Sequence, residues 1–177
     1  MRKLSMEELN RMSVGEFKEM PKLPVVVVLD NIRSQHNIGS VFRTADAFRV
    51  DKIILCGISA TPPNREIQKT ALGATESVDW SYEPQVLDAV ASLKADGYMI
   101  VAVEQTDGSV SPAEFSAVNH KKVALVFGNE INGVSDEVVA LADACIEIPQ
   151  FGTKHSFNVS VTAGIVLYEI FNKLKNV

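Results

Sequence analysis

The sequence has little cysteine and no long apolar run. Its two cysteines, Cys56 and Cys145, each stand in an apolar stretch, and their separation suits neither a zinc site nor a disulfide framework. No apolar run approaches the ~20 residues that a membrane span needs. Residues 1–20 are charged throughout and lack the apolar stretch of a signal peptide. We therefore expect reduced core thiols in a cytoplasmic protein without a membrane segment.

Several short motifs that mark particular chemistries are also missing. The chain contains no GxxxxGK[ST] or GxGxxG segment, which argues against a phosphate-cradling nucleotide site. It has no GxSxG elbow, so a serine nucleophile on an α/β sheet is not indicated. The three histidines, His36, His120 and His155, show no metal-ligand spacing such as HExxH. We expect no metal and no covalent chemistry.

What is present fits one globular domain. The chain has 177 residues, of which 46% are hydrophobic and 22% charged, and a chain of this length can bury most of its apolar surface. We assign residues 1–177 to a single domain, with a helical extension at 1–23 and a core at 24–177.

The net charge is −5, which argues against a protein coated with positive charge. Nine of the 17 Lys and Arg residues precede residue 53; they indicate either a local basic face or ordinary solubilising charge.

Apolar and helical patterns alternate along the chain. Continuous β-branched and apolar runs are typical of strands buried on both faces of a parallel sheet; they occur at 25–29, 52–56, 98–103, 123–127 and 144–148. Amphipathic patterns predict helices at 39–48, 65–72, 84–95, 135–141 and 159–175. A capping box formed by Ser5 and Glu8 predicts a further helix to about Glu19, ended by Pro21. The alternation predicts an α/β fold with a mostly parallel sheet flanked by helices.

Polar and glycine-rich segments follow the predicted strands. They lie at 30–39, 104–108, 128–133 and 149–160. Ligands of open parallel sheets bind beyond the carboxyl ends of the strands. These segments are therefore the candidate walls of a ligand site.

The first of three notable segments follows the first strand. It contains Asn37-Ile38-Gly39 and then Arg43-Thr44-Ala45. Asn37 and Gly39 are typical of a turn into a helix, with Arg43 one turn further on. The simpler interpretation is structural: Asn37 caps the helix, and Arg43 is a solvated helix residue.

The other two segments lie in the second half of the chain. Phe127-Gly128-Asn129-Glu130 and Gly133 join a strand to a helix; Glu130 is either a site carboxylate or an anion at a helix end. Ile148-Pro149 and Gly152 precede Ser156-Phe157-Asn158-Val159-Ser160 at the start of the last helix. Capping explains one of these three polar side chains well and three much less well. A helix start also suits an anionic group.

Together these segments, with Lys69-Thr70-Ala71-Leu72-Gly73-Ala74, resemble the motifs of a known family. The pattern is similar to that of the SPOUT superfamily, specifically the TrmH-type (SpoU) RNA 2′-O-ribose methyltransferases. The resemblance covers about residues 24–175, and all three motifs occur in the family's order. It implies that the chain methylates the ribose 2′-hydroxyl of an RNA, with tRNA favoured over rRNA.

The resemblance also implies a fold, a cofactor and an assembly. It predicts an α/β knot in which the C-terminal part of the chain passes through a loop. S-adenosyl-L-methionine is expected against Val103, Gly128, Ile148 and Phe157, largely through backbone contacts. A homodimer is expected, with the first motif of one subunit facing the cofactor site of the other.

Five side chains take catalytic roles by the same resemblance. Arg43 is expected to help deprotonate the ribose hydroxyl; because a guanidinium stays protonated, we assign it phosphate binding and a concerted lowering of the cost of proton loss. Asn37, Glu130, Ser156 and Asn158 are expected to orient Arg43, the ribose and the methionine end of the cofactor.

Two features depart from the family pattern. Phe157 replaces the usual Leu, which predicts a reshaped adenine pocket. With few residues outside the core, the chain is expected to bind RNA through the catalytic domain and its basic N-terminal region. Two alternatives remain: a non-catalytic RNA- or nucleotide-binding module on the same fold, and an unrelated flavodoxin-like or Rossmann-like enzyme.

Overall fold

The computed structural model describes residues 1–5, 7–9, 11–116, 122–154 and 156–174. Its strands are β1 (Leu23–Asp30), β2 (Val50–Cys56), β3 (Asp79–Glu83), β4 (Met99–Val103), β5 (Val123–Phe127) and β6 (Ala144–Ile146). Its helices are α1 (Val14–Glu19), α2 (Gln35–Ala47), α3 (Arg65–Ala71), α4 (Ala74–Ser77), α5 (Val86–Ala95), α6 (Asp136–Leu141) and α7 (Val159–Leu174).

The strands form one sheet in the order β3-β2-β1-β5-β4-β6, and each neighbouring pair is parallel. The predicted parallel α/β fold is therefore confirmed. β1 and β5 are adjacent although about a hundred residues separate them, and Leu29 pairs with Phe127. This register brings the loops that follow β1 and β5 to the same edge of the sheet.

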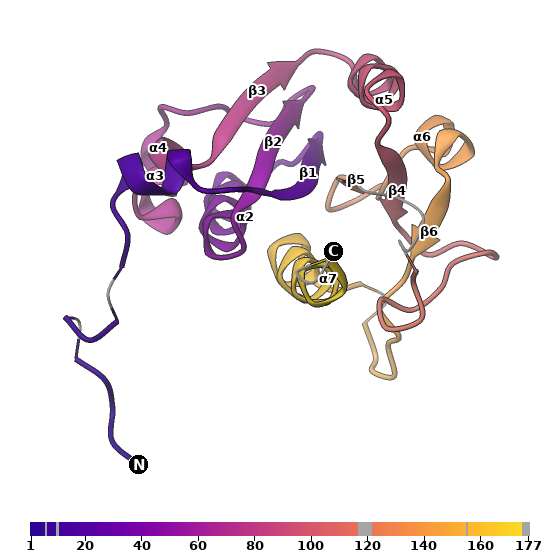
Figure 1. Ribbon diagram of the computed structural model, residues 1–177. Helices are drawn as coiled ribbons and strands as arrows, with labels where there is room; N and C mark the ends of the chain where they lie inside the picture. Colours follow the sequence, from indigo (N-terminus) through magenta and orange to yellow (C-terminus); the bar gives the residue numbers. More distant parts are fainter. Residues whose placement is uncertain (6, 10, 117–121, 155, 175–177) are drawn as a thin grey trace.

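Helices cover both faces of the sheet (Figure 1). Alternate residues of β1 point to opposite faces: Val25, Val27 and Leu29 join the larger core cluster with α2, α3 and α7, whereas Val26 and Val28 join a smaller cluster with α5 and α6. Burial on both faces explains why the central strands are continuous apolar runs.

The N-terminal helix is shorter than predicted. Ser5 and Glu8 do form the two reciprocal bonds of a capping box, but only a turn follows them. The helix begins at Val14, where Ser13 and Glu16 form a second capping box. A cap alone does not hold a short helix in water. The helix forms where Phe17, which is 4% exposed, reaches the core.

Other boundaries also differ from the predictions. α2 begins at Gln35 rather than at residue 39, because Ser34 is its N-cap. The last strand ends at Ile146 rather than at 148. β3 was not predicted, because its sequence DWSYE has no apolar run; as an edge strand it pairs only with β2. The trefoil knot stays a prediction from the family resemblance.

The cysteines are free, as predicted; Cys56 is buried and Cys145 half-buried. Burial raises the pKa of the Cys56 thiol to about 12, helped by the nearby carboxylates of Asp30 and Glu83. This thiol is therefore protonated and unreactive at neutral pH. Among the described residues, no helix is both long and apolar enough to cross a membrane.

Candidate functional site

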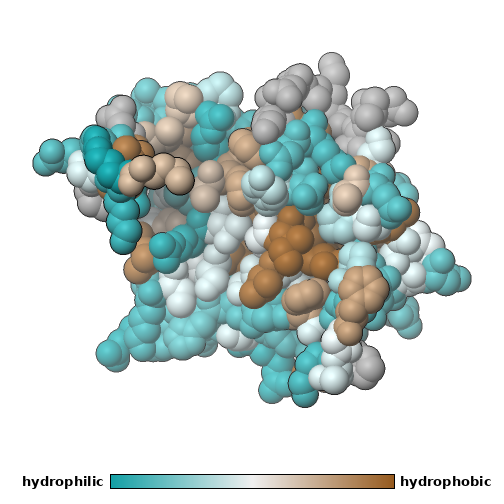
Figure 2. Space-filling view, turned by 90° about the horizontal axis from the view of Figure 1, so that it is seen from below, coloured by the Kyte–Doolittle hydropathy of each residue, from teal (hydrophilic) through white to brown (hydrophobic). Residues whose placement is uncertain are grey.

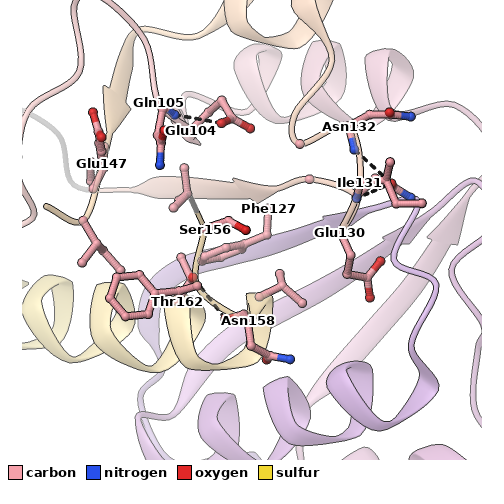
Figure 3. A pocket seen from close by; sticks show the side chains of 18 of the residues that line it. Glu104, Gln105, Phe127, Glu130, Ile131, Asn132, Glu147, Ser156, Asn158 and Thr162 are labelled. Atoms are coloured by element: carbon pink, nitrogen blue, oxygen red, sulfur yellow. Dashed lines mark hydrogen bonds between the residues drawn. The ribbon is translucent and has the colours of Figure 1, made fainter. Parts of the chain in front are cut away.

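A cavity of about 550 Å³ opens at the carboxyl ends of the strands (Figure 3). This volume lies within the range of small-molecule sites. Four segments supply its walls: the ends of β4 and β6, the loop after β5, and the start of α7. Its lining residues are Val103–Gln105, Phe127–Gly133, Ile146–Ile148, Gln150, Ser156–Val159 and Thr162.

The side chain of Asn129 fixes the conformation of the loop after β5. The Asn129 side chain donates to the Asn31 carbonyl at 2.7 Å and accepts from the backbone N–H groups of Ile131 at 2.9 Å and Asn132 at 3.3 Å. Asn129 and Gly133 also bond through their backbones. The loop is therefore shaped before any ligand binds.

The two glycines of this loop are required by close contacts. A Cβ on Gly128 would lie about 2.0 Å from the Gly133 carbonyl carbon. Gly133 has φ +68°, and a Cβ there would lie 2.1 Å from the Glu104 carboxylate. That carboxylate accepts from the Val134 N–H at 2.8 Å and from the Gln105 N–H at 2.9 Å. Glu104 thereby fixes the loop to the end of β4.

A chain of hydrogen bonds joins the three sequence segments. The Glu130 carboxylate accepts from the backbone N–H groups of Arg33 at 2.9 Å and Ser34 at 3.0 Å. It also accepts from the Asn37 side chain at 3.2 Å. The Asn158 side chain donates to the Asn37 side-chain oxygen at 3.1 Å. One residue from each segment is thus fixed at the same edge of the cavity.

The N–H donors keep Glu130 ionised. Partial burial acts to raise the pKa of its carboxyl, but the backbone donors from Arg33 and Ser34, with the Asn37 amide, outweigh burial and leave the pKa lowered. Because Ser34 is the N-cap of α2, the carboxylate sits at the first turn of that helix, where its dipole favours negative charge.

Asn37 and Asn158 have different places in their helices. The interpretation of Asn37 as the N-cap of α2 is wrong. Asn37 lies inside the first turn of α2, and its backbone N–H donates to the hydroxyl of Ser34, the N-cap. Asn158 precedes α7 and caps it, since its side-chain oxygen accepts from the Ser160 N–H at 2.9 Å. The cap leaves the Asn158 amide group to reach Asn37.

The residues predicted to bind the cofactor line one cavity. Val103 ends β4, Gly128 follows β5, Ile148 follows β6 and Phe157 precedes α7, and all four are lining residues. Ser156 also lines the cavity. Phe157 is 43% exposed, so its ring forms part of the rim rather than the core.

Arg43 does not reach this cavity. It is exposed on α2 and lines a second hollow beside α1. Gly39 is not at a turn either: a Cβ there would lie 2.2 Å from the Ile67 carbonyl oxygen, so Gly39 allows α2 to pack closely on α3. The first segment therefore places Asn37 at the site of its own chain and Arg43 outside it.

The sequence profile of the SpoU rRNA Methylase family matches residues 24–168. The chain belongs to this family.

Known relatives and solved structures agree with this assignment. A putative TrmH family tRNA/rRNA methyltransferase of Staphylococcus saprophyticus is 32% identical over 160 residues, which are 90% of this chain and 63% of the relative. The chain thus spans less than two thirds of the length of such relatives. The A. aeolicus TrmH/SpoU tRNA modifying enzyme superposes with a TM-score of 0.81 at 30% identity, over 92% of this chain and 81% of that one. The AdoMet-bound rRNA methyltransferase from Sinorhizobium meliloti gives 0.80 at 29%, over 89% and 60%.

Sequence reasoning missed three residues of this SpoU-family site. Glu104 was seen only as part of a polar segment, although a carboxylate that ends a buried strand is a usable signal. Asn31, at φ +55°, accepts from Asn129 through its carbonyl, and Asp-Asn after a strand is typical of such a turn. Glu147, which accepts from the Ser109 hydroxyl at 2.8 Å, was assigned to a strand.

The cavity is acidic. Three carboxylates, those of Glu104, Glu130 and Glu147, are among its lining residues, and no Lys, Arg or His side chain of the described part of the chain joins them. A wall of this charge favours a cationic ligand over a polyphosphate. The described residues contain no group of three or more His, Cys, Asp or Glu side chains arranged to hold a metal. His120 and His155 lie outside the described residues.

Proposed function

We propose that this chain transfers a methyl group from S-adenosyl-L-methionine to a ribose 2′-hydroxyl of RNA, with tRNA favoured over rRNA. One observation carries the proposal: the Glu130–Asn37–Asn158 chain joins all three family motifs at the edge of a preformed cavity. The preference for tRNA draws on the A. aeolicus tRNA modifying enzyme, of which this chain covers 81%.

The cavity has the properties that this cofactor requires. Its apolar walls at Val103, Ile148 and Phe157 suit the adenine ring, and its carboxylates suit a ligand with a sulfonium and an ammonium group. Bound there, S-adenosylmethionine would supply an electrophilic methyl group on its sulfonium. The Sinorhizobium meliloti neighbour is an AdoMet-bound rRNA methyltransferase.

The hydrogen bonds among Glu130, Asn37 and Asn158 fix the orientation of two amide side chains at the edge of the cavity. Glu130 fixes which end of the Asn37 amide donates, and Asn37 in turn fixes Asn158. Each amide retains one N–H that these bonds do not use, and Ser156 is a further hydroxyl-bearing residue that lines the cavity. Such preset donors position the ribose and the cofactor's carboxylate without reorganisation.

We assign Arg43 to the site of a partner subunit in a homodimer. Arg43 lies outside the cavity of its own chain. On α7, Val161, Ile165 and Tyr168 are exposed and, at this spacing, form one stripe of the helix. A hydrophobic patch lies near the middle of the face drawn in Figure 2, where Figure 1 places α7. We propose that this stripe of α7 packs against a second copy of the chain in the dimer.

A mixing experiment tests whether Arg43 acts across the dimer. Arg43→Ala and Asn158→Ala chains are unfolded together, refolded and assayed. If Arg43 acts in the partner's site, each mixed dimer keeps one intact site, and about a quarter of wild-type activity returns. Activity no higher than that of either variant alone would contradict this assignment. Light scattering reports the oligomeric state in parallel.

The activity itself is tested with labelled cofactor. The protein is incubated with methyl-labelled S-adenosylmethionine and unmodified tRNA or rRNA fractions, and the RNA is then hydrolysed in alkali. Methylation of a 2′-oxygen removes the nucleophile that cleaves the adjacent phosphodiester, so the label is expected in alkali-resistant dinucleotides. Label in mononucleotides would indicate base methylation instead and would reject the ribose assignment.

A non-catalytic RNA-binding module is the second candidate. Its supporting observation is that a single chain does not bring Arg43 to the cavity. Binding of S-adenosylmethionine and RNA without methyl transfer to any RNA fraction would favour it.

A further inference from the structure

A second hollow lies beside α1, apart from the cavity. It has a volume of about 310 Å³ and is bounded by the segment that leads into α1, the C-terminal half of α2 and the junction of α3 with α4. Its lining residues are Arg11–Val14, Phe17, Arg43, Asp46, Ala71–Ala74, Glu76 and Ser77. It shares no lining residue with the cavity.

The N-terminal wall of this hollow is held in place. Ser13 and Glu16 close the capping box of α1, which fixes the chain next to Arg11. Phe17 is 4% exposed and anchors α1. The Lys22 ammonium lies 3.5 Å from the centre of the Phe17 ring and donates to the Phe17 carbonyl.

Two guanidinium groups line the hollow without partners. Arg11 and Arg43 are both exposed, and within the described part of the chain neither has a hydrogen bond or an ion pair. The carboxylates of Asp46 and Glu76 stand on the α2 and α4 walls; Asp46 accepts from the Ser77 hydroxyl. The hollow therefore offers donors for a phosphate and, separately, acceptors for the N–H groups of a base edge.

An exposed leucine stands at the rim in an unfavourable backbone conformation. Leu72 has φ +50° and ψ +43° and is 66% exposed. The left-handed region is unfavourable for an L-residue such as leucine, and strain of this kind concentrates at functional positions. On the α1 side, Met12 and Val14 are also exposed. The hollow thus presents apolar surface at its rim next to its two cations.

We propose that this hollow binds one nucleotide of the RNA substrate. Its phosphate is held by Arg11 and Arg43, its base lies against Met12 and Leu72, and Asp46 or Glu76 accepts from the base edge. A nucleotide is the ligand class that offers an anion, an apolar face and N–H donors together. The inference rests on the proposed function: Arg43 would hold an RNA phosphate beside the partner subunit's site, and the hollow of its own chain would hold the nucleotide that carries this phosphate. It gives the N-terminal segment a specific role in substrate binding.

The experiment compares substitutions inside and outside the hollow on the full chain. Arg11→Gln and Lys18→Gln each remove one positive charge near α1, but Lys18 does not line the hollow. Leu72→Asn removes the apolar side chain, while asparagine tolerates the left-handed conformation. Binding of the unmodified tRNA fraction is measured by fluorescence anisotropy over a range of salt, and binding of S-adenosylmethionine by calorimetry.

The expected pattern is specific to the hollow. Arg11→Gln raises the Kd for RNA about five- to tenfold and lowers the salt slope by about one. Leu72→Asn raises the Kd about fivefold without changing that slope, and Lys18→Gln stays within about twofold of wild type. Affinity for S-adenosylmethionine is unchanged in all three.

Other results would overturn the inference. Equal losses from Arg11→Gln and Lys18→Gln would mean that general charge, and not the hollow, attracts RNA. A change in oligomeric state of Arg11→Gln or Leu72→Asn would make the hollow a contact between chains. If the binding pattern holds but no RNA is methylated, the proposed function fails and the nucleotide site stands.

Discussion

The cavity and the hollow differ in how their polar groups are satisfied. At the cavity, Glu130, Asn37, Asn158 and Glu104 all bond to other parts of the chain. At the hollow, the two arginines have no partner in the described structure. The polar groups of the cavity are thus already paired within the chain, whereas the two guanidinium groups of the hollow are available to an anion.

Under the proposed function, this difference separates two tasks, the binding of the cofactor and the binding of RNA. A small cofactor is bound best by groups whose geometry is already fixed, because no ordering cost is incurred on binding. A large, charged substrate is attracted by exposed cations, whose counterions are released when it binds. Substitutions at the cavity should therefore affect the cofactor and stability, and substitutions at the hollow should affect RNA.

The largest expected effect belongs to Arg43. Arg43→Ala should lower kcat/KM for RNA by about 100-fold or more, the range seen when one transition-state donor is lost. Its affinity for S-adenosylmethionine should change by less than about twofold, because Arg43 lies outside the cavity of its own chain and is assigned to the RNA rather than to the cofactor. Single-turnover methylation and calorimetry measure the two quantities. Arg43→Lys serves as the control that keeps the charge but loses the planar fork. Full activity in Arg43→Ala would contradict the assignment of Arg43 to the RNA substrate.

Gly128 tests whether the cavity is built in advance. In Gly128→Ala the new methyl group would meet the backbone of residues 133 and 134 at about 2.0 to 2.2 Å, so the loop must open. We expect a loss of roughly 2–4 kcal/mol of unfolding free energy and of most cofactor binding. Gly152→Ala is the matched control, since its Cβ would meet nothing within 4 Å. Urea unfolding of both variants decides; similar stability of the two would count against the preformed loop.

Substitution of Glu130 should lower activity less than substitution of Arg43, and its effect on stability should depend on pH. Because its pKa is lowered in the folded protein, its contribution to stability is present at pH above the ordinary value of 4.5 and is lost as the pH falls through the folded pKa. Glu130→Gln should lower kcat/KM by about tenfold, as expected for a lost charged hydrogen bond. Its stability relative to wild type should recover in acid. Thermal melts from pH 7 to pH 3 test this; a constant difference would contradict the assigned contacts.

Asp30 should have the smallest effect. Burial raises the pKa of its carboxyl, against the Asn31 amide, which donates to it at 2.7 Å. An ionised, buried carboxylate destabilises the fold at pH above its folded pKa, and this penalty disappears below its ordinary value of 3.8. Asp30→Asn should therefore stabilise the protein at pH 7 by about 1 kcal/mol or less, with no gain near pH 3. A loss of stability at pH 7 would instead assign the carboxylate a structural role.

Most of the sheet was predictable because β1, β2, β4 and β5 are buried on both faces and so consist of apolar runs. β3 was not predicted because it is an edge strand that pairs only with β2. It is not buried on both faces, so its sequence has no apolar run. The start of α2 was misplaced because Ser34, not Asn37, accepts the capping bond. Ser34 and Asn37 lie so close together that local sequence does not decide which of them caps the helix. The choice depends also on a distant carboxylate, that of Glu130, to which the Asn37 amide donates.

The site was predictable in composition but not in arrangement. Val103, Gly128, Ile148 and Phe157 were assigned from the family resemblance, and they line one cavity; their role in cofactor binding stays a prediction. Glu104 was missed because its importance depends on the Val134 N–H, 30 residues away. The separation of Asn37 from Arg43 depends on which side of α2 each faces, and hence on the packing of Gly39 against α3.

The sequence by itself determined the class of fold and the family, because burial imposes apolar runs on strands and motif residues keep their order along the chain. Tertiary structure alone decided which polar groups meet. The pairing of β1 with β5 brings Asn31 to Asn129, and the start of α7 brings Asn158 to Asn37 across more than a hundred residues. Those contacts follow from strand order and helix packing, which no local pattern encodes.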